Sequence, residues 1–290
     1  KNCTSKTEEM HNLSNDLKRF IDDTCITETL KLSKKIESNK TTKFLFQTQS
    51  HHLIESVSMI ENDRHTICLS SQVGCAVDCD FCATGKMGFK KNLSSGEIID
   101  QLLFIKNNIK NPITNIVFMG MGEPFLNYTN VIKAADLIHD SKALNFGSNR
   151  ITISTAGVLP KIDQFIADKV PYNLAISLNG ANNMIREKIM PINRKWPIED
   201  LIASSKTYNN ANRKKITFEY VLIDKVNDSV SDAYELANLL KNSSSKLNII
   251  PFNEIGTEYK RPSNNTINNF VDTLRTVQKG FKVLVRWSNG

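Results

Sequence analysis

The chain has 290 residues, of which 40% are hydrophobic and 23% are charged. This composition is typical of globular proteins and excludes wholesale disorder. No apolar run approaches the ~18 residues that a membrane span needs, and no N-terminal stretch resembles a secretory signal, so we expect a soluble, cytoplasmic protein. The net charge of +7 favours a polyanionic partner such as a nucleic acid, although a lysine-rich genome explains it equally well.

Secondary structure is predicted in chain order. Residues 1–42 are expected to be a polar helical region, and residues 43–63 alternate as a β-hairpin does, with the turn near residues 49–51. Strands are then expected at 64–70, 114–119, 150–154, 173–178, 215–223, 246–251 and 282–286. The first helix between them is expected to have Ser95 as its N-cap and to run through Ile98, Leu102, Leu103 and Ile105. Further helices are expected at 131–138, 159–167, 199–208, 230–240 and 267–279.

Apolar strands that alternate with amphipathic helices indicate parallel βα units. About six units in series predict an α/β fold, a partial (βα)6 barrel of the TIM type, with a helical N-terminal segment and a hairpin extension. We therefore divide the chain into an incomplete accessory region at 1–42, an extension at 43–63 and a barrel core at 64–290. Chemistry in such barrels belongs at the carboxyl ends of the strands, where the informative motifs fall.

A cluster of cysteines follows the first core strand. Its spacing is Cys75-x3-Cys79-x2-Cys82. Three thiolates on one short loop can bind three irons of a four-iron cluster, which leaves the fourth iron open to a small molecule. A structural zinc site needs four closed ligands. No second cysteine pair exists and no histidine follows His139, so zinc is the weaker alternative.

This spacing, with Phe81 before the last cysteine, resembles the radical S-adenosylmethionine (SAM) superfamily. The resemblance implies that SAM binds the open iron and that an electron from the cluster cleaves it to a 5′-deoxyadenosyl radical. Gly122-Glu123-Pro124 follows the next strand and resembles the superfamily's GEP element, which binds the amino group of SAM. The implied cofactors are therefore one 4Fe-4S cluster and SAM.

Longer stretches resemble the RlmN/Cfr-type family of RNA methyltransferases, especially its RlmN branch. They are CLSSQVGC (68–75), CATGKMGFKKNLSSGEI (82–98), FMGMGEP (118–124), RITISTAG (150–157), REKIMPIN (186–193) and FEYVLI…VNDS (218–229). The resemblance implies methylation of adenine C2 in 23S rRNA, and in tRNA beside the anticodon, with two SAM molecules per turnover and a methyl-cysteine intermediate. It also implies an electron donor such as flavodoxin or ferredoxin, and we expect a monomer.

The resemblance assigns roles to individual residues. The implied cluster ligands are Cys75, Cys79 and Cys82. The implied SAM contacts are Gly122, Glu123, Ser154, Ser177, Leu178, Asn179 and Asn253. Asn179 stands where the family has histidine; it keeps a donor and an acceptor but cannot be charged. Glu55 is implied as the proton acceptor and Cys68 as the thiol that resolves the covalent intermediate. Without the resemblance, Glu55 is interpreted as an exposed carboxylate on a strand.

One departure from the family pattern concerns the methyl-carrying cysteine, which the family has just after the last strand. No cysteine follows Cys82 here, and the sequence begins with Lys1 rather than with a methionine. We therefore expect truncation at both ends.

Two alternative functions remain: a radical SAM enzyme for a small-molecule or protein substrate, and a non-catalytic iron–sulfur RNA-binding protein. Lys86, Lys90 and Lys91 are candidates for phosphate contacts, or form a solvated face.

Overall fold

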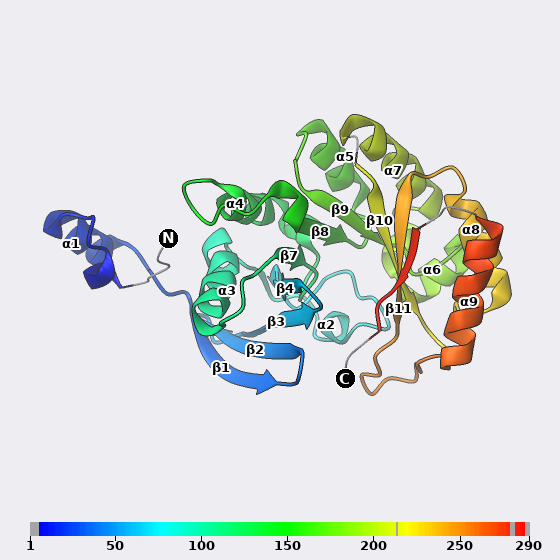
Figure 1. The fold of residues 1–290 in the computed structure, drawn as a ribbon, viewed down its shortest axis with the longest axis horizontal. Coiled ribbons are helices and arrows are strands. Elements are labelled where there is room, and N and C mark those ends of the chain that lie inside the picture. Colours follow the sequence, from blue (N-terminus) through cyan, green and yellow to red (C-terminus); the bar gives the residue numbers. More distant parts are fainter. Residues whose placement is uncertain (1–5, 213, 279–281, 288–290) are drawn as a thin grey trace.

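A computed structural model describes residues 6–212, 214–278 and 282–287. Its main feature is one ten-stranded sheet in the order β1-β2-β3-β4-β7-β8-β9-β10-β11-β12 (Figure 1). The pairs from β1 to β4 are antiparallel, and every pair from β4 to β12 is parallel. The two edge strands, β1 and β12, do not pair with each other, so the sheet curves without closing.

The bounds of the elements are as follows. The strands are β1 (Leu30–Glu37), β2 (Thr41–Thr48), β3 (Leu53–Glu61), β4 (Arg64–Cys68), β5 (Gln72–Val73), β6 (Lys91–Asn92), β7 (Asn115–Phe118), β8 (Ile151–Thr155), β9 (Asn173–Ser177), β10 (Ile216–Leu222), β11 (Ser245–Pro251) and β12 (Lys282–Val285). The α-helices are α1 (Asn15–Thr24), α2 (Ala83–Lys86), α3 (Ser95–Asn108), α4 (Tyr128–His139), α5 (Leu159–Ala167), α6 (Asn183–Ile189), α7 (Ile198–Asn212), α8 (Val230–Leu240) and α9 (Asn264–Val277). Short 3-10 turns are η1 (Thr7–Glu9), η2 (Pro124–Asn127), η3 (Ser148–Arg150) and η4 (Pro191–Arg194).

The parallel part confirms the predicted α/β partial barrel. Helices α3, α4, α5, α7, α8 and α9 each lie between two consecutive parallel strands in the chain, which makes six strand–helix units. They cover the outer side of the sheet (Figure 1). Every residue of β7 is buried, as expected for a strand that is covered on both faces. No helix in the described part of the chain is long and apolar enough to cross a membrane.

The N-terminal region differs from the prediction. Helix α1 is present and lies apart from the sheet, with none of its residues buried (Figure 1). Residues 30–37, expected to be helical, instead form strand β1 against β2. Leu30 and Leu32 alternate toward the core, whereas the lysines in this segment give it the composition of an exposed helix. Pairing with β2 favours a strand over a helix for this segment, because strand formation depends strongly on tertiary context.

The predicted hairpin is present as β2 and β3, and its buried face explains why. Phe44 and Phe46 are fully buried, and both rings pack against Phe104 of α3. This apolar face attaches the extension to the core, since strands without such a face are marginally stable. The opposite face, which carries Glu55, continues the inner surface of the barrel.

Two helix details correct the sequence-based prediction. The N-cap of α3 is Ser94 rather than Ser95: its hydroxyl accepts from the N–H of Glu97, whose carboxylate accepts from the N–H of Ser94. Helix α6 was not predicted, because seven residues are too short for a clear apolar period. Its N-cap is Asn182, whose side chain accepts from the N–H of Ile185.

Candidate active site

The cysteine loop lies at the carboxyl end of β4, where the fold predicts chemistry. Cys82 is the N-cap of α2, and its N–H donates to the carbonyl of Cys79 at 3.0 Å. A β-carbon on Gly85 would meet that same carbonyl at 3.0 Å, so the absence of a side chain lets α2 pack against the loop. The chain therefore folds into a tight turn between Cys79 and Gly85.

The three cysteines line a cavity of about 240 Å³. Its wall also includes five of the predicted SAM contacts, and its residues come from five further strands, β7 to β11, or from their ends. The lining residues are Cys75, Val77, Cys79, Phe81, Cys82, Phe118, Met119, Gly120, Gly122, Glu123, Pro124, Ser154, Thr155, Ala156, Ser177, Asn179, Met190, Glu219, Val221 and Ile250. Parallel pairing of β7 to β11 brings these segments to one edge of the sheet.

Burial disfavours the ionised form of the cysteine thiols in this cavity. Burial raises the pKa of Cys75 to about 11, and burial followed by repulsion from Cys82 and Cys75 raises the pKa of Cys79 further. No group of three or more His, Cys, Asp or Glu side chains within the described ranges is arranged to hold a metal ion. Ligands of a single zinc ion must meet within about 2.3 Å of one point, whereas three thiolates of a cluster bind three different irons.

The GEP element forms the second wall of the cavity. Gly122 has φ +98°, and a β-carbon there would lie 2.5 Å from the β-carbon of Gln72. The buried Glu123 accepts from the N–H of Phe125 at 2.9 Å and from the N–H of Ala156 at 2.7 Å. Burial raises the pKa of Glu123. This carboxylate therefore ties the end of β7 to the end of β8.

The third wall comes from β8 and β9. The hydroxyl of Ser154 donates to Oε2 of Glu219 at 3.3 Å, and Ser177 ends β9. Leu178 is fully buried and does not line the cavity; its N–H donates to the carbonyl of Glu219. Asn179 has φ +55°, a conformation that asparagine adopts more readily than most residues.

The side chain of Asn179 makes its polar contacts within the protein. Its Oδ1 accepts from the N–H of Val221 at 2.8 Å, and its Nδ2 contacts the sulfur of Met190 at 3.2 Å. Asn179 thus holds β10 beside the end of β9. Asn253 lies just after β11, is exposed, and is not part of the cavity wall.

Glu55 and Cys68 lie on the same inner face of the sheet. Cys68 pairs in register with Val57, and the hydroxyl of Ser70 donates to the carbonyl of Glu55. The side chain of Glu55 is 43% exposed, with Oε1 4.0 Å from Nζ of Lys43. Burial raises the pKa of Cys68 to about 12, and the charges of Glu219 and Glu55 add to this effect. The structure therefore brings the two residues close enough to interact electrostatically.

Two buried charged residues were missed by the sequence analysis. Glu219 lines the cavity in the middle of the apolar strand β10, and burial raises its pKa. A carboxylate inside an otherwise apolar strand could have identified it. Arg186 is completely buried in α6. It lies in the REKIMPIN stretch, which by itself does not indicate burial.

The loop after β11 covers the outside of the cysteine loop. The hydroxyl of Tyr259 donates to Oδ2 of Asp80 at 2.6 Å, and Lys86 donates to the other oxygen of the same carboxylate. Lys91 forms an ion pair with Glu97 at 2.8 Å. Two of the three lysines considered for phosphate contacts are therefore paired with carboxylates of the chain.

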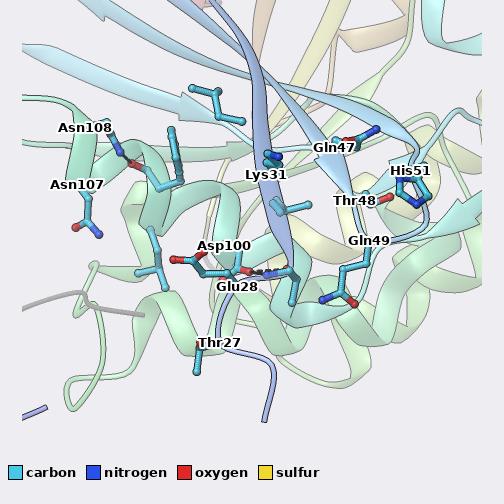
Figure 2. A pocket seen from close by; sticks show the side chains of 15 residues that line it. Thr27, Glu28, Lys31, Gln47, Thr48, Gln49, His51, Asp100, Asn107 and Asn108 are labelled. Atoms are coloured by element: carbon cyan, nitrogen blue, oxygen red, sulfur yellow. Dashed lines mark hydrogen bonds between the residues drawn. The ribbon is translucent and has the colours of Figure 1, made fainter. Parts of the chain in front are cut away.

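A larger cavity of the described chain lies elsewhere. Its volume is about 770 Å³, and it is enclosed by β1, β2 and α3 (Figure 2). Asp100 on α3 accepts from the N–H of Thr29 at 2.6 Å, which closes one end of it. None of the predicted site residues lines this cavity. Volume alone therefore does not identify the reactive centre.

Comparisons with known proteins define the class. The family model of the radical SAM superfamily matches residues 69–237, more than half of the chain. The solved structure of a radical SAM methyltransferase from Sphaerobacter thermophilus has a TM-score of 0.93 and 38% identity, over 99% of this chain and 85% of that one. Spore photoproduct lyase, at 13% identity and a TM-score of 0.55, shares the fold. This chain is a radical SAM enzyme.

Curated relatives narrow the class to one family. A dual-specificity RNA methyltransferase RlmN from Buchnera aphidicola is 43% identical over 98% of this chain and 82% of its own length. Another with the same description, from Geobacter sulfurreducens, is 41% identical over 97% of this chain and 78% of its own length. The chain belongs to the RlmN family, and it is a radical SAM RNA methyltransferase.

Proposed function

We propose that this enzyme methylates C2 of an adenine in 23S rRNA and in tRNA beside the anticodon. One observation supports the reaction site above all: the cysteine loop, Gly122, Glu123 and Ser154 line a single cavity, and Cys68 lies on the adjoining inner face. The description of the relatives as dual-specificity RNA methyltransferases supports the substrate class.

The donor set of the cavity fits a 4Fe-4S cluster held by Cys75, Cys79 and Cys82, with SAM beside it. The thiols are soft ligands whose raised pKa values reflect burial and mutual repulsion, and a bound iron would favour their thiolate form. The two carboxylates that line the cavity, Glu123 and Glu219, accept hydrogen bonds from Phe125, Ala156 and Ser154, and no imidazole is among its lining residues, whereas a closed zinc site needs a fourth ligand. The cluster and SAM supply one-electron chemistry, which an sp² carbon requires because it offers no nucleophilic lone pair.

The chain's own residues have separate tasks in this proposal. Gly122 and Glu123 present the turn on which the amino group of SAM binds, and Ser154 and Ser177 bound the opposite wall. Glu55 accepts the proton that leaves adenine C2, since its half-exposed carboxylate lies on the same face of the sheet as Cys68. Cys68 is the thiol that releases the product. Residues 1–290 contain no counterpart of the family's methyl-carrying cysteine, so no step is assigned to one.

The cellular setting completes the proposal. We propose a cytoplasmic enzyme that acts as a monomer and receives its electrons from a flavodoxin or a ferredoxin. The target base must leave its stack to reach the cavity, which favours RNA loops over continuous duplex.

The test is anaerobic reconstitution of the gene-encoded protein with iron and sulfide, followed by incubation with reductant, SAM and 23S rRNA or tRNA. We expect both 5′-deoxyadenosine and 2-methyladenosine in the digested products. Cleavage of SAM with no methyl group in either RNA would favour a small-molecule or protein substrate. Absence of SAM cleavage would favour the non-catalytic iron–sulfur protein.

A further inference from the structure

Arg186 is a charged side chain enclosed by the protein behind the cavity. It belongs to the short helix α6, and its exposed fraction is 0%. Burial lowers its pKa only to about 10, so the guanidinium is still protonated at neutral pH. A buried cation is costly unless an anion compensates it.

The hydrogen-bond partners of Arg186 are all neutral. Its Nε donates to the carbonyl of Leu178 at 3.0 Å and its Nη1 to Oδ1 of Asn193 at 2.9 Å. Its Nη2 donates to the carbonyls of Ala156 at 2.5 Å and Ser177 at 3.4 Å. No carboxylate in the described ranges forms an ion pair with Arg186. The positive charge is therefore hydrogen-bonded but not neutralised by the described chain.

The surroundings of this charge connect it to the cysteine loop. The carbonyls that accept from Nη2 of Arg186 belong to Ala156 and Ser177, which line the same cavity as the three cysteines. The N–H of Asp80, the next residue of the loop, donates to the carbonyl of Ile189 at the end of α6. A β-carbon on Gly157 would lie 3.2 Å from Nη2 of Arg186, so glycine leaves room for the guanidinium.

We propose that Arg186 is a positioning residue that places a fixed positive charge behind the cluster ligands and stabilises the reduced cluster. This inference rests on the cluster site proposed above. Three thiolates give a bound cluster net negative charge, and each electron that enters makes it more negative. A nearby buried cation favours that one-electron reduction, because the low-dielectric interior screens the attraction weakly. The same guanidinium holds the ends of β8 and β9, the walls that face SAM.

The test measures the reduction equilibrium of the cluster rather than activity alone. Wild type, Arg186→Gln and Arg186→Lys are reconstituted anaerobically, and the reduced cluster is followed by electron paramagnetic resonance during titration with dithionite. Arg186→Gln removes the charge and should lower the reduction equilibrium constant at least tenfold, which is 59 mV for one electron. Arg186→Lys keeps the charge and should stay within threefold of wild type. SAM affinity should weaken in both, because the planar fork is lost.

A surface variant controls for the loss of one positive charge. Arg194 is exposed and pairs with Glu187, so Arg194→Gln should leave the equilibrium within threefold of wild type. An unchanged equilibrium in Arg186→Gln with full iron content would overturn the inference. So would a tenfold fall in Arg186→Lys, or loss of its cluster, because both would show that the charge is not the cause.

The outcomes separate this inference from the proposed function. If wild type itself binds no iron and sulfide, the proposed cluster site is wrong whatever the variants do. If wild type binds the cluster but Arg186→Gln does not fold, Arg186→Lys becomes the test. A reduction equilibrium within threefold of wild type then supports the inference, and a tenfold fall overturns it. Iron and sulfide content and thermal unfolding are measured for every variant before the titration.

Discussion

Glu123 offers a direct test of how the cavity is held together, and Glu123→Ala is the perturbation. The substitution leaves two buried donors, the N–H groups of Phe125 and Ala156, without their acceptor. Each unsatisfied buried donor costs about 1–3 kcal/mol, and relief from burying the carboxylate offsets part of the sum. We expect a net loss of about 3 kcal/mol in the free energy of unfolding. For a chain of 290 residues, whose unfolding entropy is about 2.1 cal/mol/K per residue, that is roughly 5 °C in melting temperature.

The assay is thermal unfolding of the cluster-free protein, followed by circular dichroism. Leaving out iron and SAM separates the structural role of Glu123 from cofactor binding. Glu187→Ala is the matched control, because Glu187 is exposed and its ion pair with Arg194 contributes at most about 1 kcal/mol. A melting temperature for Glu123→Ala that equals that of the control would refute the reasoning.

Three further predictions concern charge and metal binding. Burial raises the pKa of Glu219 above its unfolded value of 4.5, so its contribution to stability is present at low pH and is lost as pH rises through the folded pKa. The stability of Glu219→Gln relative to wild type should therefore increase from pH 5 to pH 8 in denaturant titrations, and a flat or falling difference contradicts this. Cys79→Ala should lose the visible absorbance of the reconstituted protein and its SAM cleavage, whereas Cys25→Ala, at an exposed cysteine, should keep both; retention in Cys79→Ala argues against the ligand assignment. RNA affinity should fall with added salt, by about 0.7 in log K per log salt for each single-strand phosphate contact, and binding indifferent to salt would favour a small-molecule substrate.

Much of the barrel could be predicted because its strands and helices have clear and different periods. The helix expected at 159–167 matches α5, and the strand expected at 246–251 lies within β11. The N-terminal region was harder to predict because half of the residues in β1 are charged, and its structure depends on pairing with β2. Such pairing is a long-range property that a local pattern does not contain.

The candidate site was predictable where spacing alone determines the chemistry. The three cysteines follow one strand, so their meeting at one cavity follows from topology. Glu219 and Arg186 were missed because burial of a charge depends on neighbours distant in sequence, such as Ser154 and Ala156. For Asn253 the resemblance implies a contact with SAM, but only the structure reveals that this residue is exposed.

The two edge strands of the sheet, β1 and β12, are not paired with each other, and this has a consequence for the size of the substrate. A fully closed eight-stranded barrel fills its interior with side chains, and its ligands enter from one end. In the described part of the chain the sheet ends at β1 and β12 without pairing these two strands, so the sheet is open at its side as well as at its end. One nucleotide of a long RNA chain can then enter the barrel from the side while the rest of the chain stays outside. The RNA does not need a free end near the target base.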